Sequence, residues 1–141
     1  GLYKVTEGVY QVRGYSIANI TFVETDNGWF VMDVATSMEC AKAAKDLVEK
    51  NLGVRPVYAI SYSHTHGDHY AGAKMFATEQ QVADGSVRIF APEGFMEKVA
   101  SENILLGAAM GRRATYQFSG DSPSIYGAVN RDVNIFVGYG Q

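Results

Sequence analysis

The first third of the chain is dominated by short stretches rich in Val, Ile, Tyr, Phe and Thr. They span residues 9–14, 18–25 and 28–34, and their length and composition are typical of β-strands. The sequence TDNG at residues 25–28 joins the last two stretches and has the turn chemistry of a hairpin. The pattern therefore predicts an antiparallel β meander.

A helical pattern follows the third stretch. Thr36 with Glu39 makes a plausible capping box, and Gly53 supplies a stop. Between these signals the apolar residues recur at spacings of three and four, which predicts an amphipathic helix over 37–52 whose apolar face lies on the sheet. These residues are Met38, Ala41, Ala44, Val48 and Leu52.

The next stretch, VYAISYS at residues 57–63, is almost continuously apolar. Such a run is typical of a parallel strand covered on both faces. Together with the strand at 28–34 and the helix at 37–52, it predicts a βαβ unit with a right-handed crossover. Ligands of open α/β sheets bind at the carboxyl ends of such strands, so the loop after residue 63 is a candidate site.

The remaining pattern predicts more helix than strand. Pro92 suits a first helical turn, and from Ser119 onward the periodicity weakens. The predicted elements are a short helix near 77–84, a strand at 87–91, a helix from 92 to about 103, a second helix near 104–114, and a brief apolar run at 133–137.

Composition and charge exclude several partners. Hydrophobic residues make up 47% of the 141 residues and charged residues 19%, a balance typical of one globular domain. The net charge of −3, without a run of Lys or Arg, argues against a nucleic-acid partner. No apolar stretch is long enough for a membrane span. Location stays open: periplasmic or secreted if a signal peptide has been removed, otherwise cytoplasmic.

The one cysteine, Cys40, falls within the predicted amphipathic helix. It has no partner in the chain for a disulfide, and its position favours a small buried hydrophobic side chain over a reactive thiol.

All three histidines lie in the sequence SHTHGDHY, at positions 64, 66 and 69, with Asp68 between the second and third. In an extended segment His64 and His66 project to the same side, and Gly67 permits a bend that presents Asp68 and His69 elsewhere. Imidazole and carboxylate are usual zinc ligands and acceptable ligands for iron or manganese. We interpret this loop as a metal-binding loop rather than a polar surface loop.

The segment SHTHGDHYAGA resembles the signature loop of the metallo-β-lactamase superfamily. The resemblance implies an α+β fold, an αββα sandwich of which this chain would form the amino-terminal half. It also implies two zinc ions, or other divalent transition metals, that share an activated hydroxide. His64 and His66 would then bind the first metal, while Asp68 and His69 would bind the second. Asp68 would also be a catalytic residue.

Asp33, in the context FVMDVAT, matches the aspartate that ends the preceding strand in that superfamily. The resemblance implies that it orients a ligand imidazole or the loop backbone. A cap on the turn between strand and helix is an equally good interpretation.

A narrower resemblance extends over most of the chain. The stretches GVYQVRGYSIANITFVETDNGWFVMD, APEGFMEKVASEN and GRRATYQFSG are similar to those of linear alkylsulfatases, which hydrolyse primary alkyl sulfate esters such as dodecyl sulfate. This implies an amphiphilic sulfate ester as substrate, with attack at carbon. Another hydrolase of the superfamily, such as a thioesterase or lactonase, and a metal-binding module without catalysis are the alternatives.

The family comparison also implies that residues 1–141 are only the amino-terminal part of a catalytic domain. Further glutamate and histidine ligands would come from a carboxy-terminal polypeptide, and the complete enzyme would be a homodimer. Two ligands per metal are too few, since catalytic zinc usually has three protein ligands. We therefore expect little activity from this chain alone.

Arg112 and Arg113 could grip a sulfate group, because planar guanidinium donors match its oxygens. Adjacent residues of a helix point in different directions, so a solvated or interdomain pair is the alternative interpretation.

Overall fold

The computed structural model describes residues 1–109 and 112–113. Its contacts divide the chain into a unit of residues 1–93 and a unit of residues 94–141. The first unit contains the sheet and the histidine loop.

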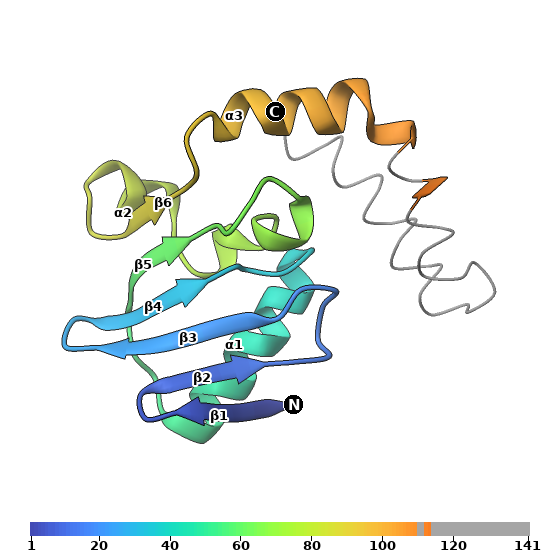
Figure 1. Cartoon of the computed structure of the whole chain (residues 1–141). Coiled ribbons are helices and arrows are strands. Elements are labelled where there is room, and N and C mark those ends of the chain that lie inside the picture. The colour runs from blue at the N-terminus through green and yellow to red at the C-terminus, as the bar shows by residue number, and fades with distance from the viewer. Residues whose placement is uncertain (110–111, 114–141) are drawn as a thin grey trace. The chain divides into compact units, whose positions relative to one another are not determined.

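A six-stranded sheet forms the first unit, with its strands in chain order (Figure 1). β1 to β4 pair antiparallel, whereas β4, β5 and β6 pair parallel. The strands are β1 (Leu2–Thr6), β2 (Val9–Val12), β3 (Ile20–Thr25), β4 (Gly28–Met32), β5 (Val57–Ser61) and β6 (Arg88–Phe90).

The predicted meander is confirmed, including its hairpin. Thr25 pairs with Gly28, so Asp26 and Asn27 form a two-residue loop. The hydroxyl of Thr25 donates to the carbonyl of Gly28 at 2.6 Å and fixes the turn. Strand β1 was not predicted, because it lies at the edge of the sheet and four of its five residues are exposed.

The predicted helix is confirmed as α1 (Met38–Leu52), and Gly53 ends it with a φ of +86°. The predicted cap is wrong by one residue: the hydroxyl of Ser37 accepts the N–H of Cys40 at 3.3 Å. Thr36 is buried and engaged elsewhere, since its N–H donates to the hydroxyl of Ser16 at 3.0 Å.

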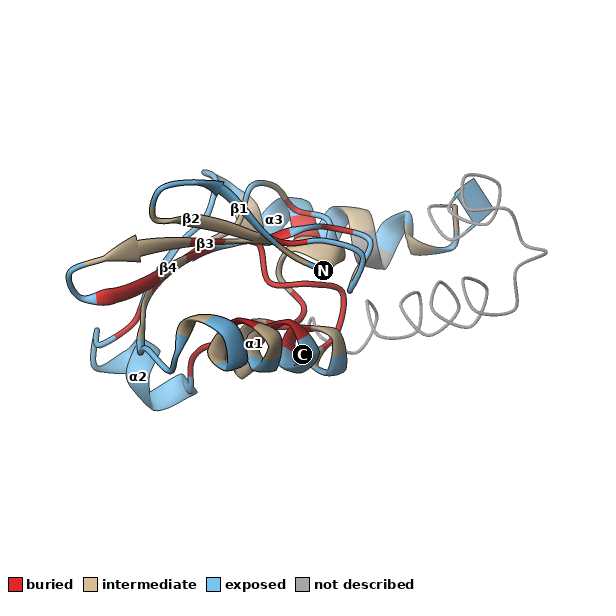
Figure 2. Ribbon diagram, turned by 90° about the horizontal axis from the view of Figure 1, so that it is seen from below, coloured by how far each residue is buried: buried red, intermediate tan, exposed pale blue. Residues whose placement is uncertain are grey.

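One face of α1 covers one face of the sheet, and the core lies between them (Figure 2). Trp29 makes edge-to-face contacts with Tyr10 and Phe22, at centroid separations of 6.0 and 5.8 Å. The main buried side chains of this layer are Val12, Ile20, Phe22, Trp29, Val31, Ala41, Ala44, Val48 and Ile60. α1 connects β4 to β5, and these two strands pair parallel, so the predicted βαβ unit is confirmed.

Three short helical segments connect β5 to β6. The predicted helix near 77–84 is present as α2 (Glu79–Ala83), with a capping box between Thr78 and Gln81. The 3₁₀ turns η1 (Gly67–His69) and η2 (Ala73–Met75) precede it. The sequence pattern does not predict these turns, because a single turn of three residues has no hydrophobic periodicity.

In the second unit, α3 (Phe95–Ala100) continues as a π-helical turn, η3 (Ser101–Leu105). The helix predicted from residue 92 begins later, because Gly94 before it has a left-handed φ of +70°. Of the helix predicted near 104–114, residues 104–105 belong to η3, and residues 107–109 and 112–113 are α-helical. The apolar run at 133–137 lies outside the described residues. No helix in the described part of the chain is long and apolar enough to span a bilayer.

Substitution of Gly72 by alanine is expected to destabilise the first unit. A Cβ at this position would lie 2.0 Å from the carbonyl oxygen of Val34 and 2.6 Å from Cβ of Ala41, so the backbone must move. We expect a loss of about 1–3 kcal/mol in the free energy of unfolding, measured by urea titration with Trp29 fluorescence. Gly107→Ala is the control, because its added Cβ would meet nothing within 4 Å. Equal stability of the two variants would contradict the close contact.

Candidate metal centre

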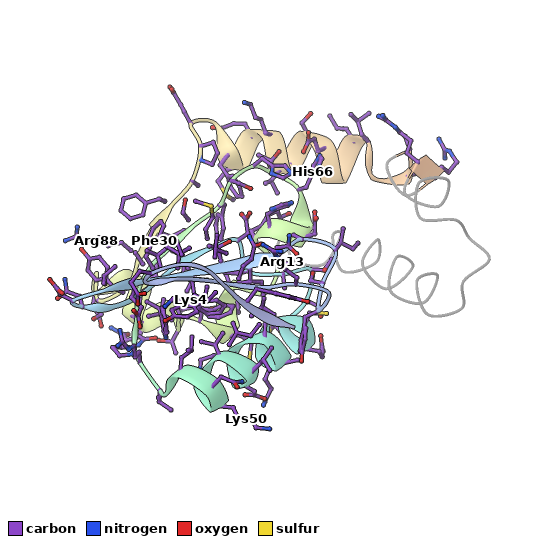
Figure 3. The ribbon with its side chains drawn as sticks, turned by 60° about the horizontal axis from the view of Figure 1, so that its bottom comes forward. Lys4, Arg13, Phe30, Lys50, His66 and Arg88 are labelled. Atoms are coloured by element: carbon purple, nitrogen blue, oxygen red, sulfur yellow. The ribbon has the colours of Figure 1, made fainter. Side chains whose placement is uncertain are left out.

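The three histidines and Asp68 lie in the loop that follows β5. This strand ends at Ser61, and the chain then turns through residues 62–66 into η1. His66 lies on this loop, at the opposite end of the first unit from Lys50 in the last turn of α1 (Figure 3). The candidate ligands therefore lie at the carboxyl end of a parallel strand, where such sheets bind ligands.

Backbone hydrogen bonds join this loop to the turn between β4 and α1. The N–H of Asp33 donates to the carbonyl of Ser61 at 2.9 Å, and the N–H of Val34 donates to the carbonyl of His69 at 3.0 Å. Asp33 and Ala35 have positive φ angles of 59° and 71°. Such backbone is costly for residues other than glycine and persists where its surroundings hold it in place.

The carboxylate of Asp33 extends this link to the side chains. Its Oδ1 accepts the N–H of Ser63 at 2.9 Å, and its Oδ2 accepts the hydroxyl of Ser63 at 2.9 Å. The same Oδ2 lies 2.8 Å from Nδ1 of His69. Of the two interpretations of Asp33, these contacts favour orientation of the loop, since Ser37 caps α1.

The imidazole rings of the loop are close to one another. The ring of His64 lies 3.9 Å from that of His69 and 4.6 Å from that of His66, measured between centroids. The Nε2 atom of His69 is 3.2 Å from Oδ2 of Asp68. One carboxylate thus lies at each nitrogen of His69.

These contacts determine the protonation of the metal-free loop. Burial lowers the pKa of His69, but its hydrogen bonds with Asp33 and Asp68 outweigh burial and raise it to about 9. Burial, followed by the charges of His69 and His66, lowers the pKa of His64. For Asp33 and Asp68, burial raises the pKa, yet the bond to His69 contributes to a net lowering. The two carboxylates therefore favour the protonated form of His69.

The donor set fits zinc by its chemistry. Imidazole nitrogens and a carboxylate are usual zinc ligands, and two donors each about 2.1 Å from one tetrahedral ion lie about 3.4 Å apart. The 3.2 Å between Nε2 of His69 and Oδ2 of Asp68 is close to that separation. Within residues 1–109 and 112–113, however, no three His, Cys, Asp or Glu side chains form a set that could hold an ion.

The other residues singled out from the sequence are not part of this loop. Arg112 and Arg113 are exposed and belong to the unit of residues 94–141. Cys40 is half-buried and packs against the core. Ser63 could not be identified from the sequence, because only the folded chain brings its hydroxyl to Asp33.

A comparison with known families identifies the fold. The family model described as the metallo-beta-lactamase superfamily matches residues 13–137. The chain belongs to the metallo-beta-lactamase superfamily. The mixed sheet with helices is that fold, as the sequence predicted.

Relatives within the superfamily include several alkylsulfatases. The chain is 46% identical over 118 residues to a linear primary-alkylsulfatase of Pseudomonas sp, a match that covers 84% of this chain and 18% of that protein. It is 44% identical over 131 residues to an alkyl/aryl-sulfatase of Saccharomyces cerevisiae, covering 92% of this chain and 20% of that protein.

A solved structure of a stereoselective inverting sec-alkylsulfatase from Pseudomonas sp. superposes with a TM-score of 0.77 at 47% identity. That match covers 83% of this chain and 18% of the other. The chain thus spans about a fifth of the length of these superfamily members. The identities of 46% to a primary alkylsulfatase and of 47% to a secondary alkylsulfatase are nearly equal.

We expect the stability of the metal-free chain to depend on the proton of His69. Its folded pKa of about 9 exceeds the ordinary 6.5, so its contribution is fully present below about pH 6.5 and is lost as the pH rises through about 9. Asp33→Asn removes the negative charge beside Nδ1 of His69. The pKa of His69 should then fall, and the chain should lose less stability as the pH rises. NMR titration and urea unfolding across this range, with chelator present, measure both.

Asp46→Asn is the matched control, because Asp46 pairs with Lys42 on the exposed face of α1 at 2.6 Å. It should leave the titration of His69 unchanged. A pKa of His69 near 6.5 in the unsubstituted chain would contradict the ion pair.

Proposed function

We propose that this chain supplies part of a two-metal centre to an enzyme that hydrolyses primary alkyl sulfate esters. The observation that carries this proposal is the loop of His64, His66, Asp68 and His69, seated on Asp33 at the end of β5. The 46% identity to a linear primary-alkylsulfatase supports an alkyl sulfate ester as the substrate, and the choice of a primary ester follows the resemblance of APEGFMEKVASEN and GRRATYQFSG to linear alkylsulfatases. Residues 1–141 would form the amino-terminal part of the catalytic domain.

His64 and His66 would hold one divalent ion, and Asp68 and His69 the other. When bound, zinc would lower the pKa of water towards 7 and offset negative charge on the sulfate oxygens. Asp33 keeps the Nδ1 proton of His69, so Nε2 is the nitrogen that must lose its proton to become a ligand. The remaining ligands would come from the polypeptide beyond this chain.

The bond that breaks follows from the same proposal. A related protein is described as a stereoselective inverting sec-alkylsulfatase. Inversion requires attack at the carbon that carries the sulfate, because cleavage between sulfur and oxygen leaves that carbon untouched. By analogy, we propose that water attacks the primary carbon here and that inorganic sulfate departs with the ester oxygen.

The proposal predicts release of inorganic sulfate from dodecyl sulfate by the complete, zinc-loaded polypeptide. His66→Ala should reduce this rate by more than the roughly 10–100-fold that loss of a residue supporting a ligand costs. Ion chromatography measures the sulfate, and hydrolysis in ¹⁸O-water should place the label in the alcohol. Lys50→Ala, at the far end of α1, should leave the rate unchanged.

Other substrates give the contrary outcomes. Release of sulfate from octan-2-yl sulfate but not from dodecyl sulfate would show that the enzyme acts on secondary rather than primary esters. Hydrolysis of an acyl thioester or a lactone, with no sulfate released from either ester, would overturn the proposal. Label found in the sulfate would overturn attack at carbon.

A further inference from the structure

Three polar groups surround the hydroxyl of Ser63. Its oxygen lies 2.9 Å from Oδ2 of Asp33, 3.0 Å from Nδ1 of His64 and 3.2 Å from Nδ1 of His69. A hydroxyl has one proton to donate and two lone pairs with which to accept. The identity of the neighbours therefore determines which bond takes the proton.

The proton must go to Asp33. An ionised carboxylate can only accept, and two oxygens 2.9 Å apart repel unless a proton lies between them. The same Oδ2 of Asp33 lies 2.8 Å from Nδ1 of His69, and Oδ1 accepts the backbone N–H of Ser63, so both carboxylate oxygens act as acceptors. The hydroxyl of Ser63 is thus left with its two lone pairs for the histidines.

The consequence for His64 is a fixed tautomer. At 3.0 Å the hydroxyl oxygen can bond to Nδ1 of His64 only as an acceptor, so Nδ1 carries the ring proton. A neutral imidazole has one N–H, which leaves Nε2 of His64 with its lone pair free to bind a metal.

We propose that Ser63 is a positioning residue for the metal centre. Its hydroxyl donates to Asp33 and accepts from Nδ1 of His64, and so holds His64 as the Nδ1–H tautomer. This inference rests on the proposed function, because it concerns the proposed ligand of the first ion. Asp33 bonds directly to Nδ1 of His69 and, through Ser63, to Nδ1 of His64. One buried carboxylate therefore orients a ligand of each ion.

NMR of the metal-free 141-residue chain tests the tautomer directly. Nitrogen-15 spectra of the histidine rings, recorded where His64 is neutral, distinguish a protonated from an unprotonated Nδ1. We expect the Nδ1–H form of His64 in the unsubstituted chain and in Ser63→Thr, which keeps the hydroxyl. In Ser63→Ala the fraction of the Nε2–H form should rise. An Nε2–H tautomer in the unsubstituted chain would overturn the inference, whether or not any variant folds.

Zinc affinity tests the consequence for the metal. In competition with a chromophoric chelator, the complete polypeptide carrying Ser63→Ala should bind its first zinc ion about 10–100-fold more weakly. Ser63→Thr should restore the affinity. Ser86→Ala is the matched control, because the hydroxyl of Ser86 bonds to Asp84 outside the histidine loop. Equal affinities for Ser63→Ala and Ser86→Ala would contradict the role of Ser63.

The two proposals fail separately. If sulfate is never released but the tautomer and the affinities follow the pattern above, the proposed substrate is wrong and the role of Ser63 stands. If sulfate is released at normal rates while Ser63→Ala leaves both the tautomer and the zinc affinity unchanged, the role of Ser63 is wrong and the function stands.

Discussion

The carboxylate of Asp33 is the contact on which the candidate site depends. It is buried, it follows β4 directly, and it accepts three hydrogen bonds from the loop that follows β5. A buried carboxylate without such partners would be strongly destabilising. The bonds that satisfy its charge are the same bonds that place Ser63 and His69, so the stability of this turn and the geometry of the loop have one origin.

This arrangement requires the parallel pairing of β4 and β5. The crossover through α1 places the two strands side by side with both carboxyl ends at one edge, and the core beneath α1 fixes their register. His69 lies between Asp33 and Asp68, whose carboxylates favour its protonated form. Under the proposed function, metal binding at Asp68 and His69 would displace a proton from Nε2 of His69, while Asp33 would keep the ring in place.

Much of this could be predicted from the sequence, because apolar periodicity reports burial. The meander, α1 and β5 all bury a continuous face, and the cluster of all three histidines marks this loop as a candidate metal site, which stays a prediction. Features that depend on contacts between distant segments could not be predicted. Edge strand β1 buries too little to show a pattern, Thr36 bonds to the distant Ser16 instead of capping α1, and the contact of Ser63 with Asp33 joins residues 30 positions apart.

The central claim is that one loop, fixed by Asp33, presents donors to two metal ions. Anomalous diffraction at the zinc edge, from crystals of the zinc-loaded complete polypeptide, tests it most directly. The account predicts two peaks, one beside His64 and His66 and the other beside Asp68 and His69. Zinc bound elsewhere, with no peak beside these side chains, would contradict it.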